Sequence, residues 1–402
     1  MDNKNQKLLN ELVSNITTKE EFDKVQEALL KQGIESLLNA EMLAHLGYAK
    51  GEKPIDGNVR NGFSEKTIKS RDGNHRIKIP RDREASFDPV TIPKHKRISQ
   101  DLEDTILLLY ARGMSNADIT YFMEKTYGVA YSTSQISIIT DTLLEDIRKW
   151  QIRPLDDQYA VVWIDGIHYK IRHEGRVVTK ACMLVIGINM DGQQDLLSMH
   201  ITEVESASAW MSMLDDLKSR GVQDILFICS DNLTGLDKAI EAVYPQTIRQ
   251  ICIVHQVRNS LKYVSYNERR EMARDIKEIY RSINEDAALK AFELFKEKWG
   301  KKYRIAVKSW EVNWDNLTAF LQYPQEIRKL IYTTNVIESF NAGLRKYTKN
   351  KKSFPTDDAA LKSIYLGALN VQDRWQKSRQ GWSQIYNQLY INFESRVKPT
   401  NR

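Results

Sequence analysis

The sequence predicts a mixed α/β protein whose sheet lies in the middle of the chain. Apolar runs of strand length, separated by turn residues, fill residues 159–255, and the later runs alternate with two helical segments. Residues 1–150 are mainly helical by the spacing of their apolar side chains, and helical spacing returns from about residue 256. A meander of strands followed by helix, strand, helix and strand predicts a mixed sheet with helices on its faces.

The bulk composition indicates an ordinary globular chain of two or three domains. Its 402 residues are 42% apolar, and the longest strongly apolar run, residues 181–188, is far shorter than the roughly 20 residues of a membrane-spanning helix. Residues 1–15 contain no apolar segment typical of a signal peptide. The three cysteines (Cys182, Cys229 and Cys252) are too few and too scattered for a disulfide framework. These features predict a cytoplasmic protein with no membrane partner.

The positive charge is concentrated in two places. The net charge is +6, and residues 50–97 hold 13 Lys and Arg against 7 Asp and Glu. A second basic run contains no acid and consists of Arg345, Lys346, Lys349, Lys351 and Lys352. Local basic patches on a nearly balanced chain indicate a polyanionic partner such as DNA. A solvated face that keeps the protein soluble is the alternative interpretation.

Residues 1–48 form the first predicted region. Within residues 5–47 we expect one long helix, because apolar side chains recur at steps of three and four residues. The stripe is broad enough to pack against the rest of the protein or against a second subunit. Its members are Phe22, Val25, Leu29, Leu30, Ile34, Leu37, Leu38, Met42 and Leu46.

Residues 49–98 form a basic segment with a predicted β-hairpin. Asp72, Gly73 and Asn74 supply the turn, and Ile77 and Ile79 alternate with basic residues on the returning strand. A basic two-stranded ribbon suits contact with a DNA backbone. An ordinary edge hairpin fits the same pattern.

Residues 99–150 predict three helices with glycine in the connecting turns. Ser99 and Ser115 are the expected N-caps of the first two, and the third begins after Val129. This arrangement is typical of a helix-turn-helix, and equally of a plain three-helix bundle. In a helix-turn-helix, the polar start of the third helix would face a DNA groove through Ser132, Thr133, Ser134 and Gln135. Residues 151–157 follow as a linker.

Two predicted buried strands each end in an aspartate. Asp165 follows an apolar run that starts at Tyr159, and Asp231 follows residues 224–230. The carboxyl ends of strands in an α/β sheet are where ligand sites form. Either aspartate alone is explained as a turn or a helix cap. Two on one sheet favour a metal site.

A third acid, Glu338, lies on the predicted helix that precedes the second basic run. Helical spacing places it on a polar stripe with Asn335, Asn341 and Arg345, between apolar flanks. A solvated helix face is the simpler interpretation. Three carboxylates, however, suit Mg²⁺, and two such ions promote in-line phosphoryl displacement. The basic run after Glu338 would then hold the DNA backbone beside the acids.

Four long segments resemble the Mutator-type bacterial insertion-sequence transposases. They are VVWIDGIHYKIR, ICSDNLTGLDKAIEAVYP, RQICIVHQVRNSLKYV and EIRKLIYTTNVIESFNAGLRK, and RNGFSEKTIKS matches near the front. The resemblance runs through nearly the whole chain. It implies an RNase H-like catalytic core whose Asp-Asp-Glu triad is Asp165, Asp231 and Glu338. The family's usual glycine after the second aspartate is Asn232 here, which affects the turn and not the ligand.

The resemblance also implies the division of the chain and its chemistry. The core would comprise residues 158–255 and 331–402, with an all-helical insertion domain at 256–330 between the second Asp and the Glu. The implied cofactor is Mg²⁺ or Mn²⁺, with two ions and no nucleotide. The implied partners are terminal inverted repeats, target DNA and further copies of the chain. A homodimer or larger assembly is expected, because two DNA ends must be joined.

Two further features have competing interpretations. The family carries a Cys-x2-His pair, here Cys252 and His255, whose spacing suits zinc. Zinc normally takes four ligands and no second close pair exists, so we favour a structural or DNA-positioning role. Trp310 and Trp314 either stack on an unpaired base or pack in a helical core, and core packing is the stronger hypothesis.

The sequence therefore predicts a DNA transposase that cuts one strand, frees a 3′-OH and transfers it to a target phosphodiester. Two rivals stay open. One is an RNase H-like nuclease or resolvase, which would cleave without joining strands. The other is a DNA-binding regulator with an inactive catalytic domain, against which the presence of all three acids counts.

Overall fold

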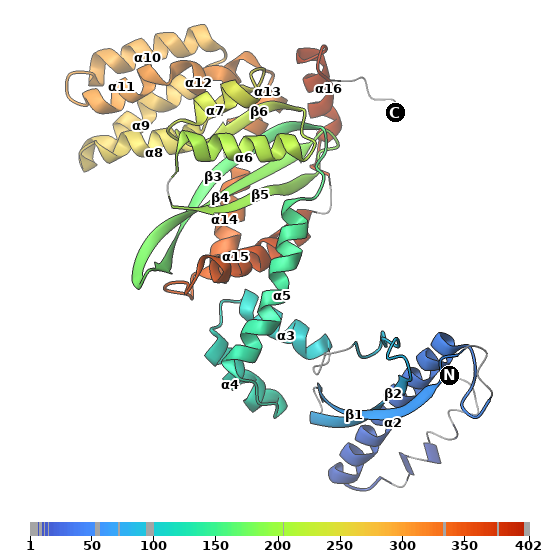
Figure 1. The fold of residues 1–402 in the computed structure, drawn as a ribbon. Coiled ribbons are helices and arrows are strands. Elements are labelled where there is room, and N and C mark those ends of the chain that lie inside the picture. Colours follow the sequence, from blue (N-terminus) through green and yellow to red (C-terminus); the bar gives the residue numbers. More distant parts are fainter. Residues whose placement is uncertain are drawn as a thin grey trace. The chain divides into compact units, whose positions relative to one another are not determined.

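The computed structural model describes residues 7, 10–11, 13–14, 16–52, 57–70, 73–93, 100–203, 205–332, 335–375 and 378–397. The chain divides into two compact units. Met1–Tyr110 with Met114–Thr140 form the first, and Ala111–Gly113 with Asp141–Arg402 form the second. Figure 1 shows the elements of both. No helix among the described residues is long and apolar enough to cross a membrane.

In the first unit, a long helix covers a β-hairpin. Helix α2 spans Lys19–Leu46, and strands β1 (Arg60–Ser70) and β2 (Gly73–Asp82) pair antiparallel. The predicted hairpin is therefore confirmed. The shared core consists of Leu38, Ile68, Ile77, Ile79 and Ile92.

Two sequence-based boundaries in this unit were wrong. The helix expected over residues 5–47 is interrupted, because Thr18 caps α2 in a capping box with Glu21. The Thr-x-x-Glu pattern was the missed signal. The predicted hairpin turn lies slightly too far along the chain. Gly73 and Asn74 belong to β2, whereas Asp72 lies outside the described residues.

Three helices follow the hairpin segment, as predicted. They are α3 (Gln100–Ala111), α4 (Asn116–Tyr127) and α5 (Thr133–Gln151). Ser115 caps α4 in a capping box with Asp118, and Gly128 ends that helix in the left-handed conformation. Ser99, the expected cap of α3, lies outside the described residues.

The second unit contains the predicted mixed sheet. Its five strands lie in the order β5-β4-β3-β6-β7, with β3, β4 and β5 antiparallel and β6 and β7 parallel to β3. The strands are β3 (Gln158–His173), β4 (Arg176–Asn189), β5 (Gln194–Thr202), β6 (Asp224–Ser230) and β7 (Ile248–Ile251).

Strand β3 is twice as long as the sequence indicated. The expectation that a strand ends at Asp165 was wrong, because β3 continues to His173 and pairs with β4 up to Arg176. Glu174 and Gly175, both in the left-handed region, form the tight turn between them. Asp165 therefore lies in mid-strand. What ends beside it is the neighbouring strand β6.

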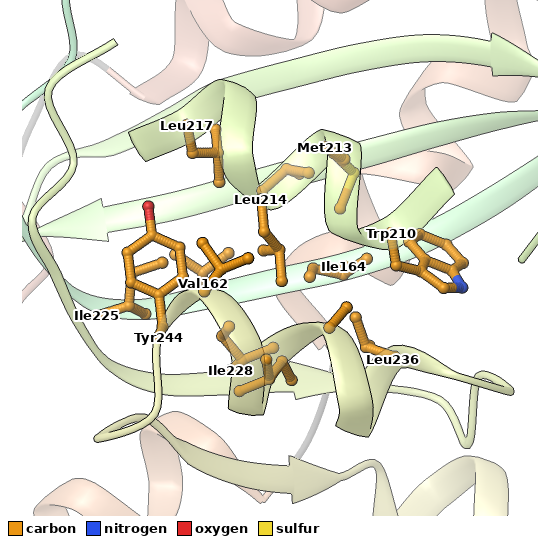
Figure 2. Packing of buried hydrophobic residues seen from close by; sticks show 14 of the residues in the cluster. Val162, Ile164, Trp210, Met213, Leu214, Leu217, Ile225, Ile228, Leu236 and Tyr244 are labelled. Atoms are coloured by element: carbon orange, nitrogen blue, oxygen red, sulfur yellow. The ribbon is translucent and has the colours of Figure 1, made fainter. Parts of the chain in front are cut away.

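Helices cover both faces of this sheet (Figure 1). Helices α6 (Ala207–Ser219) and α7 (Leu236–Val243) pack on one face, and Figure 2 shows Trp210 and Leu214 of α6 against Val162 and Ile164 of β3. Side chains alternate between the faces of a strand. Asp165 therefore points to the opposite face, where α14 (Asn335–Thr348) and α15 (Asp357–Gln372) lie.

Between β7 and α14 the structure is helical throughout the described residues. The elements are α8 (Ile253–Lys262), α9 (Tyr266–Tyr280), α10 (Glu285–Trp299), α11 (Arg304–Val312), α12 (Trp314–Thr318), the 3₁₀ turn Ala319–Gln322 and α13 (Gln325–Ile331). Another 3₁₀ turn, Asp373–Trp375, follows α15, and α16 spans Trp382–Asn392. The expectation that a strand reaches His255 was wrong, because the first helical hydrogen bond already joins Gln256 N to Cys252 O at 3.0 Å.

The two tryptophans of the helical segment have packing roles. Trp310 is fully buried, and its indole Nε1 donates to Ser260 Oγ at 3.0 Å. The Trp314 ring lies 4.9 Å from the Phe292 ring, measured between centroids. Burial excludes base stacking for Trp310, and the core-packing hypothesis is confirmed for this residue.

Substitution of Leu214 by Ala tests the core between α6 and the sheet. Leu214 is fully buried, so we expect the free energy of unfolding to fall by about 2–5 kcal/mol. Met211, on the same helix, is 37% exposed, and its replacement by Ala should change stability by less than about 0.5 kcal/mol. Urea unfolding followed by tryptophan fluorescence measures both. Equal effects of the two substitutions would contradict this packing.

Candidate active site

The parallel pairing of β3 with β6 brings the two aspartates together. The last paired residues are Ile164 and Ser230, so Asp165 and Asp231 are the next residue on each chain segment. The pKa of Asp165 is raised to about 6, chiefly by burial and next by the nearby charge of Asp231. A buried carboxyl group beside a second acid is an arrangement that a cation would relieve.

Helix α14 adds Glu338 to this pair through a histidine. His255 Nε2 lies 3.1 Å from Glu338 Oε1, and His255 Nδ1 contacts Asp231 Oδ1. His255 thus lies between the second aspartate and the glutamate. Its pKa is raised to about 10, chiefly by the hydrogen bond with Asp231 and next by one with Cys252. The structure therefore brings together all three acids that the sequence selected.

Asn341 ties the same helix to the first aspartate. Its amide Nδ2 donates to Asp165 Oδ2 at 2.5 Å, and the backbone N–H of Gly166 donates to Asp165 Oδ1 at 2.8 Å. Asn341 is buried, whereas Asn335, two turns earlier on the predicted polar stripe, is exposed. Of these two asparagines on the predicted polar stripe, only Asn341 contacts an acid of the site.

Cys252 and His255 belong to the same site. Ligand atoms of Asp231, Cys252 and His255 all lie within 4.8 Å of one another. The sequence pattern indicated no third ligand for the pair, and the structure supplies Asp231. It was missed because the aspartate had already been assigned to the acidic triad and because His255 was placed on a strand. Cys252, at the start of α8, is buried.

The basic run after Glu338 divides into exposed and buried members. Arg345, Lys346, Lys349 and Lys352 are exposed. Lys351 is partly buried, and burial lowers its pKa to about 8; its ammonium lies 5.4 Å from the centre of the Phe354 ring. Four of the five cations therefore face solvent as a DNA contact requires, and Lys351 is the exception.

The polar start of α5 has a structural role for two of its four residues. Ser132 Oγ accepts from Gln135 N at 3.1 Å, and Gln135 Oε1 accepts from Ser132 N at 2.9 Å. This reciprocal capping box begins the helix. Thr133 and Ser134 are exposed between them, so these two side chains are the freer candidates for contact with a DNA groove.

Comparison with known proteins identifies the family. A family model described as "Transposase, Mutator family" matches residues 1–378. The chain belongs to the Mutator family of transposases. It is 39% identical, over 97% of this chain and 98% of the relative, to the transposase for insertion sequence element ISRM3 of Rhizobium meliloti (strain 1021). It is 33% identical, over 96% and 98%, to the transposase for insertion sequence element IS905 of Lactococcus lactis subsp. lactis (strain IL1403).

The resemblance that the sequence motifs indicated is thereby confirmed for this Mutator-family chain. Among solved structures, it is similar to the Drosophila P element transposase strand transfer complex, with 10% identity and a TM-score of 0.36. The match covers 69% of this chain and 93% of the other.

Asn341 and Asn335 form a matched pair for testing the site. Substitution of Asn341 by Ala removes the amide donor of the buried Asp165 carboxyl, so we expect the free energy of unfolding to fall by about 1–3 kcal/mol. Asn335→Ala, on the exposed part of the same helix, should change it by less than about 0.5 kcal/mol. Urea unfolding without added divalent ions measures both. An Asn341→Ala protein as stable as Asn335→Ala would contradict the described contact.

Proposed function

We propose that this chain is the transposase of a bacterial insertion sequence, and that Asp165, Asp231 and Glu338 form its catalytic centre. The observation that carries the proposal is a set of contacts between β3, the end of β6 and α14. Asp231 and Glu338 both contact His255, and Asn341, on the helix of Glu338, donates to Asp165 beside Asp231. The two relatives described above, which are named as transposases for insertion sequence elements and align over nearly their full length, support the same activity.

The chemistry of the donor set fits a divalent ion. Three carboxylates are hard oxygen ligands of the kind that Mg²⁺ and Mn²⁺ prefer. The raised pKa of Asp165 reflects burial and the nearby charge of Asp231, both of which a bound cation would offset. Asp165, Asp231 and Glu338 would hold the metal, and we propose two Mg²⁺ or Mn²⁺ ions. When bound, they would supply Lewis-acid stabilisation of the attacking and leaving oxygens in DNA cleavage and strand transfer.

The remaining residues of the centre orient these carboxylates. Asn341 fixes the rotation of the Asp165 carboxyl through its amide, and Gly166 N–H holds the other oxygen. His255 lies between Asp231 and Glu338 and offsets their charge. Cys252 would act with it as an auxiliary residue at the start of α8. Arg345, Lys346, Lys349 and Lys352 are exposed on and after the helix that carries Glu338, where they would bind the phosphates of the DNA.

We infer an RNase H-like core for the second unit. The order β3-β4-β5-α6-β6-α7-β7, with α14 returning to the sheet, supports this fold, and helices α8 to α13 would be its insertion domain. The first unit would recognise the terminal inverted repeats through the hairpin and α5, with Thr133 and Ser134 facing the DNA. A homodimer or larger assembly would hold two DNA ends. The proposed regions are 1–48, 49–98, 99–150, 158–255, 256–330 and 331–402.

Metal binding is testable without activity. We expect Mn²⁺ to raise the thermal unfolding midpoint of the wild-type chain, since a ligand of the native state stabilises it by about 2.7 kcal/mol at a hundred times its dissociation constant. Asp165→Asn, Asp231→Asn and Glu338→Gln should each reduce this rise. Glu241→Gln, which removes an exposed carboxylate on α7, should leave it unchanged. A rise of wild-type size in all three site variants would place the metal elsewhere.

Catalysis is tested with labelled DNA carrying the element's terminal repeat. With Mg²⁺, wild type and Glu241→Gln should nick the DNA and join the freed 3′ end to a second duplex. The three carboxylate variants should bind the same DNA and do neither, because each loses an anionic ligand at the centre. Cleavage without joining would favour a nuclease or resolvase. Binding without cleavage by wild type would favour a regulator.

A further inference from the structure

We propose that the outer part of the β3–β4 hairpin, residues 169–180, is a second DNA-binding surface, which contacts the phosphate backbone beyond the catalytic centre. We call these residues the arm. The inference rests on the proposed function, because it requires that DNA reaches the acids. The arm's own basic residues, Lys170, Arg172 and Arg176, are distinct from the basic run that follows Glu338.

The arm leaves the sheet immediately after the acidic centre. Strand β6 pairs with β3 only as far as Ile164, and β5 pairs with β4 only from Ala181 onward. Beyond these residues β3 and β4 pair with each other up to His173 and Arg176 (Figure 1). Strand β3, which carries Asp165, thus continues beyond the sheet as one strand of a two-stranded ribbon.

One face of the arm is anchored. Phe354, in the loop after the basic run, accepts from Arg172 N at 2.9 Å through its carbonyl and donates to Lys170 O at 2.8 Å. Its ring lies 5.8 Å from that of Tyr169, and Ile171 is buried on the same face. The arm is therefore held in place rather than free, and the loop that carries the exposed Lys352 is bonded to it.

The other face presents positive charge without local compensation. Lys170 and Arg172 are exposed on this face, and Arg176 is exposed at the tip, paired with His173. Within the described part of the chain the three side chains have no acidic partner. The neighbouring acids serve Lys180, whose ammonium lies 2.9 Å from Asp357 and 3.2 Å from Glu203. Glu174, in the tip, is the arm's one acid.

Several surface lysines elsewhere in the same unit are paired with neighbouring acids. On the helical segment, Lys296 pairs with Glu311, Lys298 with Asp275 and Glu271, and Lys302 with Glu268. The alternative is that the arm is basic only to keep the protein soluble. Solubility alone does not require that unpaired cations occupy alternate residues of an anchored ribbon. Uncompensated cations on a fixed surface suit a polyanion that arrives from outside.

The positions of the cations predict how far along the DNA they reach. Lys170 and Arg172 lie five and seven residues after Asp165 on one strand. At about 3.3 Å per residue these are roughly 17 and 23 Å, which correspond to about five and seven base pairs at about 3.4 Å each. Both residues are an odd number of positions from Asp165, so their side chains leave the strand on the opposite face. A DNA backbone that contacts them must pass around the edge of the ribbon, so we expect these phosphate contacts no nearer than about five base pairs from the cleaved bond.

The test compares two double variants that remove the same charge. Lys170→Gln with Arg172→Gln removes two charges from the arm. Lys238→Gln with Lys290→Gln removes two from exposed lysines on α7 and α10 that have no acidic partner among the described residues. Affinity for a 60-base-pair duplex that contains the element's end is measured from low to high salt. Each lost phosphate contact lowers the slope of log K against log salt by about 0.9, so the arm variant should lose about 1.8 and the control nothing.

Two further measurements keep the result interpretable. The charge-conserving pair Lys170→Arg with Arg172→Lys should restore the wild-type slope, which a folding defect in the arm would not explain. A duplex that ends about three base pairs from the cleavage site on both sides should bind wild type and arm variant equally, because it does not reach the cations.

The outcomes separate this inference from the proposed function. If wild type binds, cuts and joins DNA while the arm variant keeps the wild-type slope on the long duplex, the arm is not a DNA surface and the inference is overturned. An equal loss in the control pair would overturn it too, since the effect would then be one of net charge. If wild type neither binds nor cuts the duplex, the proposed function itself fails.

Discussion

The pairing of β3 with β6 is the constraint on which the candidate site depends. It ends at Ile164 and Ser230, and this sets two aspartates side by side, with Asp165 at a depth where burial raises the pKa of its carboxyl group. Placing the acids at the end of a rigid, fully buried pair of strands fixes their backbones before any ligand arrives. The same placement brings two negative charges close together at a partly buried position, which favours the binding of a cation.

The side chains around the acids offset part of this conflict. Asn341 and Gly166 give Asp165 two hydrogen bonds, and His255 lies against both Asp231 and Glu338. These contacts come from α14, β3 and α8, so three elements far apart in the sequence are held at one point. A cluster that raises the pKa of a carboxyl group in this way is poor for stability and typical of a functional site.

Strand β3 joins three parts of the second unit. Its first half packs in the core beneath α6 and α7, its middle carries Asp165, and its outer half forms the anchored ribbon with β4. Because one continuous backbone carries all three, the distance from core to acid to ribbon is fixed. The Phe354 loop closes the ribbon against the end of α14, so the basic run and the ribbon are mechanically linked.

The sequence by itself determined the order of elements, the mixed sheet and the choice of three acids. Periodicity reports local burial, and the long motifs around Asp165, Asp231 and Glu338 carry the family signal. It could not determine the length of β3, because the apolar pattern weakens after Asp165 while pairing with β4 continues to His173. It also misplaced His255 on a strand.

Only the tertiary structure decided that His255 lies between Asp231 and Glu338, that Asn341 and not Asn335 holds Asp165, and that Lys351 is partly buried. These facts depend on contacts between residues distant in the chain, and no local pattern encodes which side of a helix meets which strand.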